Sequence, residues 1–132
     1  MLKDIAKSIY LERNMNCAEA VLHAADEAYG YHLDDACFKL IGGFGGGCSC
    51  GNLCGAVAAS IAALGYETIE TKANETPALG EKCKAFMETF TERYGSVLCA
   101  ELKAKDYDPS MRCYKVVQAA ADLLEEVRGP KE

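Results

Sequence analysis

The chain has 132 residues, and its eight cysteines are the residues that could do chemistry. Four of them follow a residue that can cap a helix, so each falls in the first turn of a different predicted helix: Cys17, Cys54, Cys99 and Cys113. A helix start offers free backbone N–H groups and a partial positive charge, which favour a thiolate over a thiol. If the four starts converge, they form an electropositive pocket that suits an iron–sulfur cluster or a redox thiol pair of low pKa.

A glycine-rich stretch precedes the densest group of cysteines. Residues 42–47 read Gly-Gly-Phe-Gly-Gly-Gly, and the C-x-C-x₃-C run of Cys48, Cys50 and Cys54 follows. This spacing differs from the common ferredoxin spacings. Flexible glycines let backbone N–H groups approach the sulfides of a cluster. We therefore expect cofactor contacts from four glycines, with Cys48 and Cys50 covering the site or serving as alternate ligands: Gly45, Gly46, Gly47 and Gly55.

Cys37 and Cys83 favour a simpler interpretation. Cys83 lies midway along an apolar helical stripe, and Cys37 is next to Phe38 in a short predicted helix. Because cysteine is among the most buried residue types, we expect these two to pack rather than react.

Helical periodicity dominates the chain, and strand patterns are nearly absent. Asn16 and Glu19 predict a capping box for a helix that ends at Gly30. Asn52 is expected to cap a helix of small residues that ends at Gly65. Two further caps are expected at Ser96 and Ser110. The prediction is an all-α, compact bundle of five or six helices with a Gly/Cys-rich loop, forming a single domain over residues 1–132.

Composition narrows the function classes. The formal net charge is −6 and the sequence pI is about 5.0, so nucleic acid and anionic membrane surfaces are not expected partners. No apolar run approaches the roughly 18 residues that cross a bilayer. The N-terminus shows no secretory signal, which predicts a cytoplasmic protein with reduced thiols. This compartment favours reactive or metal-binding cysteines over a disulfide framework.

The order of these motifs resembles the C_GCAxxG_C_C family of redox-active proteins. The first family cysteine is Cys17, the Cys-Gly-Ala block begins at Cys54, and Cys99 and Cys113 follow. Ala59 stands where the block has its final glycine, and Cys48 and Cys50 are additions to the four-cysteine pattern. The family is related to the iron–sulfur part of split-Soret cytochromes, and this resemblance implies a cluster site.

Three functions are therefore open. The first is a redox protein, more an electron carrier than a stand-alone enzyme, that holds an iron–sulfur cluster on the four family cysteines and serves a redox partner protein. The second is a thiol–disulfide oxidoreductase without a cofactor, in which Cys54 attacks and Cys48 or Cys50 resolves. The third is a structural zinc site. The small residues of the 55–64 helix suit close packing within the chain or in a homodimer.

Overall fold

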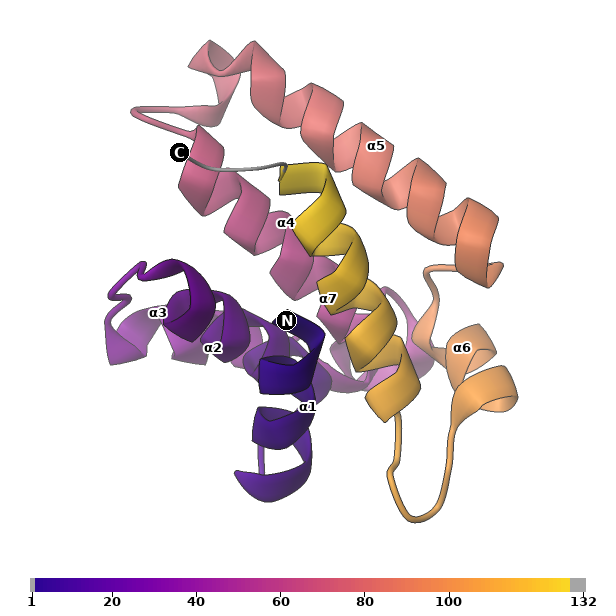
Figure 1. The fold of residues 1–132 in the computed structure, drawn as a ribbon. Coiled ribbons are helices and arrows are strands. Elements are labelled where there is room, and N and C mark those ends of the chain that lie inside the picture. Colours follow the sequence, from indigo (N-terminus) through magenta and orange to yellow (C-terminus); the bar gives the residue numbers. More distant parts are fainter. Residues whose placement is uncertain (1, 129–132) are drawn as a thin grey trace.

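The computed structural model describes residues 2–128 as a bundle of helices (Figure 1). The prediction of an all-α fold is confirmed, with seven α-helices in this range rather than five or six. They are α1 (Leu2–Glu12), α2 (Cys17–Tyr29), α3 (Asp35–Gly42), α4 (Gly55–Thr68), α5 (Pro77–Tyr94), α6 (Cys99–Asp106) and α7 (Tyr114–Arg128). Two short turns, η1 (Gly47–Gly51) and η2 (Ala73–Glu75), complete the elements.

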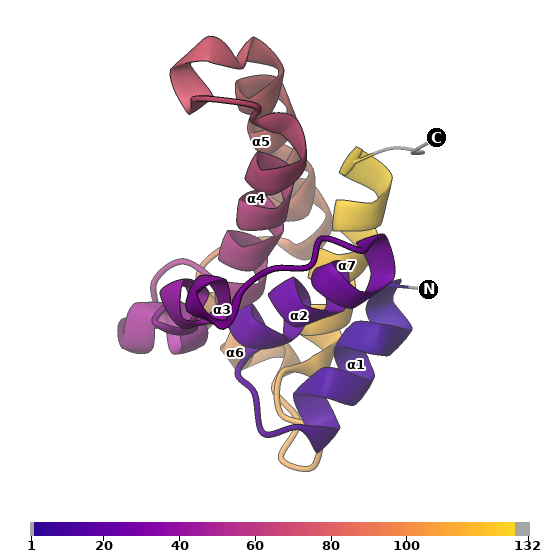
Figure 2. The same cartoon turned by 90° about the vertical axis from the view of Figure 1, so that its left-hand side faces the viewer.

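The core forms where α2 and α4 meet, with α1 and α7 packed around them and α5 against α4 and α7 (Figures 1 and 2). Its largest fully buried side chains include Phe86, Phe90 and Leu64. The small residues of α4 are buried against α2, α5 and α7, so the chain uses them internally. A homodimer stays a prediction.

The capping box at the start of α2 is confirmed. The Glu19 N–H donates to Asn16 Oδ1 at 2.9 Å, and the Asn16 N–H donates to Glu19 Oε1 at 3.0 Å. The Asn16 side-chain amide also donates to the Gly42 carbonyl at 3.0 Å, which ties the start of α2 to the end of α3. The first cysteine thus follows a cap that is itself held in place.

The predicted caps at Asn52 and Ser96 are wrong, because the segments that contain them pair with each other. Leu53 and Leu98 form an isolated antiparallel bridge. The Cys54 N–H donates to the Val97 carbonyl at 2.8 Å, and the Cys99 N–H donates to the Asn52 carbonyl at 2.6 Å. This pairing keeps both segments extended. Cys54 itself then becomes the N-cap of α4, and Leu98 becomes the N-cap of α6.

The third misplaced cap lies before α7. With Ser110 as the N-cap, the last helix would begin three residues before its observed first residue. Instead, Asp108 and Arg112 form a bridge, and Arg112 has a left-handed φ of 55°. The helix therefore begins at Tyr114. As a result of these shifts, three cysteines lie closer to their helix starts than the sequence predicts: Cys54 at the N-cap, Cys99 at the first residue of α6 and Cys113 directly before α7.

At the other end of the bundle, α4 continues past Gly65 to Thr68 and joins a buried ion pair. Arg128 Nε donates to Glu67 Oε2 at 2.8 Å, and the two side chains are 9% and 6% exposed. The Tyr31 hydroxyl also donates to Glu67, and the Arg128 guanidinium lies 3.4 Å from the centre of the Tyr29 ring. This network fastens the last turns of α4 and α7 to the segment around the end of α2.

Candidate functional site

Four cysteines from four separate elements line one small cavity. Cys17 begins α2, Cys54 caps α4, Cys99 begins α6 and Cys113 precedes α7. The cavity encloses about 20 Å³ of free volume. Its remaining lining residues are Leu102, Lys103 and Val116. The cavity therefore combines four sulfurs, a largely apolar wall and one cationic side chain.

Cys113 is held in place by α1. Its backbone N–H donates to the Tyr10 hydroxyl at 3.1 Å. The neighbouring Arg112 donates to the Tyr10 carbonyl at 2.6 Å and places its guanidinium 4.2 Å from the centre of the Tyr10 ring. Tyr10 is 5% exposed. Sequence reasoning missed this pair, because nothing in the local pattern links residues about one hundred positions apart.

Lys103 is the other site residue that the sequence analysis missed, although a signal for it exists. It follows Cys99 by four positions in α6, and residues at that spacing share one face of a helix. Lys103 lowers the pKa of both the Cys99 and the Cys113 thiols, although burial has the larger and opposite effect. A basic residue one turn after a helix-start cysteine could have drawn attention to this position.

Three of the four glycines expected to contact a cofactor instead allow side chains and backbone to approach closely. A Cβ on Gly47 would lie 2.5 Å from the Cβ of Cys99, and one on Gly55 would lie 2.8 Å from the Cys17 sulfur. A Cβ on Gly45 would collide with the side chain of Asn16. Gly46 has a left-handed φ of 65° and open space around it. These glycines therefore seat two cysteines and the α2 cap, and contact with a cofactor stays a prediction.

The other four cysteines lie outside the cavity. Cys48 and Cys50 are exposed on η1. Cys37 and Cys83 are half-buried, each among mainly apolar side chains, in keeping with the packing interpretation. Cys54 is only 4% exposed. Cys48 and Cys50 are not among the residues that line the cavity, and their roles as a cover, as alternate ligands or as partners of Cys54 stay predictions.

Burial works against thiolate formation in this cavity. It raises the pKa of the Cys54 thiol to about 12, and the N–H groups of Val57 and Ala56 offset only part of this. Burial also raises the pKa of Cys99 and of Cys113. The expected thiol of low pKa is therefore wrong for these three, because the loss of hydration outweighs the effect of the helix starts.

The raised pKa gives a direct chemical prediction for the metal-free chain. At pH 8, Cys54 should react with iodoacetamide about 10³-fold more slowly than a thiol with the ordinary pKa of 9.0, because far less of it is thiolate. Timed alkylation followed by peptide mass spectrometry measures this rate. The exposed Cys50 provides an internal comparison. Labelling of Cys54 as fast as that of Cys50 would contradict the burial argument.

The donor set of the cavity suits a thiophilic metal group. It contains four thiols and no carboxylate or imidazole, a combination typical of zinc and iron–sulfur sites. No three His, Cys, Asp or Glu side chains within residues 2–128 are already arranged around a single metal ion. A tetrahedral zinc site, with Zn–S bonds of about 2.3 Å, would require sulfurs about 3.8 Å apart. The four thiols do not have this arrangement in the structure.

A cluster distributes its thiolates over several metal ions and needs more room than 20 Å³. The element most easily displaced is α6, since its only buried residue is Leu102 and it packs mainly against η1 and α7. An outward shift of α6 would enlarge the cavity, but it would withdraw Leu102 from the core and strain the hydrogen bond from the Cys99 N–H to the Asn52 carbonyl. The thiols therefore fit a cluster by their chemistry, whereas the cavity as it stands is smaller than a cluster.

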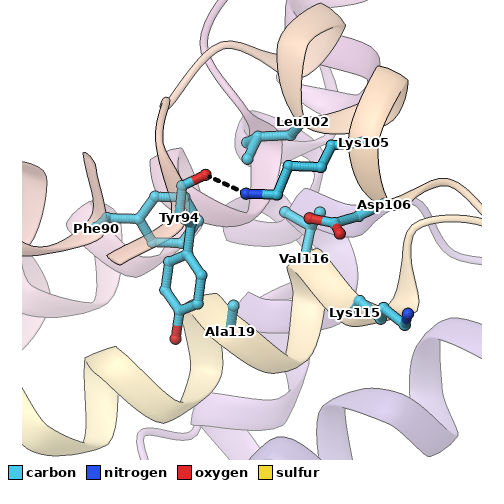
Figure 3. Close-up of a pocket in the computed structure, with 8 residues that line it drawn as sticks. All are labelled: Phe90, Tyr94, Leu102, Lys105, Asp106, Lys115, Val116 and Ala119. Carbon is cyan, nitrogen blue, oxygen red and sulfur yellow. Dashed lines mark hydrogen bonds between the residues drawn. The ribbon is translucent and has the colours of Figure 1, made fainter. Parts of the chain in front are cut away.

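A second pocket adjoins the thiol cavity through a shared wall. Leu102 and Val116 line both. The outer pocket has a volume of about 220 Å³ and is also lined by Phe90, Tyr94, Lys105, Asp106, Lys115 and Ala119 (Figure 3). The Lys105 ammonium donates to the Tyr94 carbonyl at 3.0 Å. One layer of side chains thus separates the four sulfurs from a pocket with charged groups at its rim.

Comparison with known proteins agrees with this arrangement of cysteines. A family model described as "Putative redox-active protein (C_GCAxxG_C_C)" matches residues 15–127. The chain belongs to the C_GCAxxG_C_C family. All four cavity cysteines lie within the matched range, so the cavity belongs to the C_GCAxxG_C_C domain itself. No curated protein and no solved structure matches the chain. Among residues 2–128, no helix has the length and apolar character needed to cross a bilayer.

Proposed function

We propose that this chain is a cytoplasmic electron carrier that holds an iron–sulfur cluster on Cys17, Cys54, Cys99 and Cys113. One observation carries the proposal: four cysteines spread over 97 positions, each at the start of a different helix, line a single cavity. Cysteines that served only to fill the core would not be expected to gather at four helix starts around one cavity. When bound, the cluster would supply one-electron redox chemistry, and a partner protein would exchange the electron.

The surroundings of the four sulfurs support a negatively charged group. Four thiolates carry more negative charge than the positive iron–sulfide core of a cluster cancels, and burying uncompensated charge costs several kcal/mol. Helix starts offset roughly 0.3–1 kcal/mol each. Lys103 adds a positive charge at the cavity. The chain therefore offers the compensation that such a group needs.

Because the thiol pKa values are raised, metal binding must remove protons from these cysteines. Metal ions bind thiolates, so each ligand loses a proton on binding. In the metal-free chain, burial keeps Cys54, Cys99 and Cys113 in the protonated form more strongly than in water. Loading is therefore expected to release protons and to become more favourable as the pH rises. In the metal-free chain Cys54 is consequently a poor nucleophile, which argues against disulfide chemistry based on Cys54.

Anaerobic purification followed by iron and sulfide analysis tests this function. The expected result is a brown protein with matching iron and acid-labile sulfide, whose visible absorption bleaches on reduction with dithionite. Where the purified protein lacks a cluster, ferrous iron and sulfide supplied anaerobically should restore it. A colourless protein that binds stoichiometric zinc and takes up no iron after this treatment would reject the proposal.

A further inference from the structure

Cys48 and Cys50 form a second pair of thiols that the four-cysteine cavity does not use. Both side chains are exposed, and both lie on η1 with only Ser49 between them. Both cysteines lie outside the α-helices, and neither lines the thiol cavity. This pair is therefore separate from the four proposed ligands.

The backbone of this turn brings the two cysteines close together. Cys48 has φ 61° and ψ 33°, and Ser49 has φ 60° and ψ 16°, so two successive non-glycine residues are left-handed. Helical curvature of either hand places Cα atoms two residues apart at about 5.4 Å. Disulfides usually join Cα atoms about 4.4–6.8 Å apart. The turn thus holds Cys48 and Cys50 at a separation that a disulfide can span.

The same turn also contacts the thiol cavity from outside. The Asn52 N–H donates to the Gly47 carbonyl at 2.9 Å, and the Asn52 carbonyl accepts the Cys99 N–H at 2.6 Å. The Cys50 thiol lies 3.5 Å from the Gly47 carbonyl and can donate to it. One turn therefore carries the exposed pair on its solvent side and seats Cys99 on its inner side.

We propose that Cys48 and Cys50 are a redox-active dithiol that exchanges with low-molecular-weight disulfides. One of the two thiolates attacks the small disulfide, forms a mixed disulfide and releases one small thiolate. The second cysteine then attacks the protein sulfur of that mixed disulfide and releases the other small thiolate. The two cysteines together lose two electrons and two protons, and the small disulfide gains them as two thiols.

Exposure of the full chain, as purified, to oxidised glutathione tests this inference. Acid quenching, denaturation and alkylation then count free thiols by mass. We expect the count to fall from eight to six, with the new disulfide inside the tryptic peptide of residues 40–72. Cys54, the third cysteine of that peptide, should be alkylated. Cys50→Ser should instead accumulate one glutathione on Cys48.

Matched variants complete the test. Cys37→Ser removes a half-buried thiol outside the turn and should still lose two thiols, from seven to five. The double variant Cys48→Ser/Cys50→Ser should lose none and should keep the iron content of the parent chain. An unchanged count in the parent chain, or glutathione on both cysteines, would overturn the inference. Iron loss in the double variant would also overturn it, because the pair would then be ligands.

Discussion

Replacing Cys54 with serine is expected to abolish iron binding by the reconstituted chain. Cys54 is the most buried of the four cavity cysteines, and it is the N-cap residue from which α4 begins. Its sulfur points into a cavity that offers no other ligand type. Serine preserves the size and capping ability of the residue but supplies a hard, weakly acidic hydroxyl in place of a soft thiolate. Iron and sulfide per chain, measured after anaerobic reconstitution, should fall to background.

Cys83→Ser is the matched control for that substitution. Cys83 lies half-buried on α5, in an apolar groove beside Ile61 and Met87. This change should lower stability modestly and leave iron binding intact. Circular dichroism of both variants separates lost ligation from lost folding. Full iron content in a folded Cys54→Ser protein would exclude Cys54 as a ligand.

Removing the carboxylate of Glu67 is expected to destabilise the fold by about 3 kcal/mol, since one partner of a buried ion pair is lost and the other charge stays buried. Glu67→Gln would leave the Arg128 guanidinium, 9% exposed, without its 2.8 Å partner. It would also weaken the contact that Glu67 makes with the Tyr31 hydroxyl. Urea unfolding followed by circular dichroism should show a lower midpoint with an unchanged slope.

Glu126→Gln is the appropriate control, because it breaks a second arginine–glutamate pair that also involves α7. Arg93 donates to both Glu126 oxygens, at 2.9 and 2.8 Å, but the two side chains are 43% and 52% exposed. Exposed pairs are screened by water and contribute little. The unfolding midpoint of this variant should stay near that of the parent chain. Equal losses in the two variants would show that burial does not determine the value of these pairs.

The sequence predicts the helical class well because its local patterns agree with one another. The Asn16 capping box and the glycine stop after α2 are short-range features, and the structure has both. The positions of the other helix starts depend on the Leu53–Leu98 bridge and on the left-handed Arg112, which no local pattern reveals. The shifts at these starts place Cys54 and Cys99 next to each other.

The pKa values of the cavity thiols were harder to predict than the identity of the four cysteines that line the cavity. A helix start favours a thiolate, and this reasoning holds for an exposed cysteine. The sequence does not show how deeply Cys54 is buried, and burial reverses the direction of its pKa. The contacts of Tyr10 with Arg112 and Cys113 also depend on burial, since they form only once α1 has packed against α7.

The four cavity cysteines differ in how firmly the rest of the chain holds the element that carries each of them. Three of them stand on elements held by several contacts: Cys17 follows the α2 cap, Cys54 begins the buried α4, and Cys113 is bonded to Tyr10. Cys99 stands on a helix with a single buried residue. If the cavity must widen to admit a metal group, we expect α6 to shift more than the elements that carry the other three cysteines.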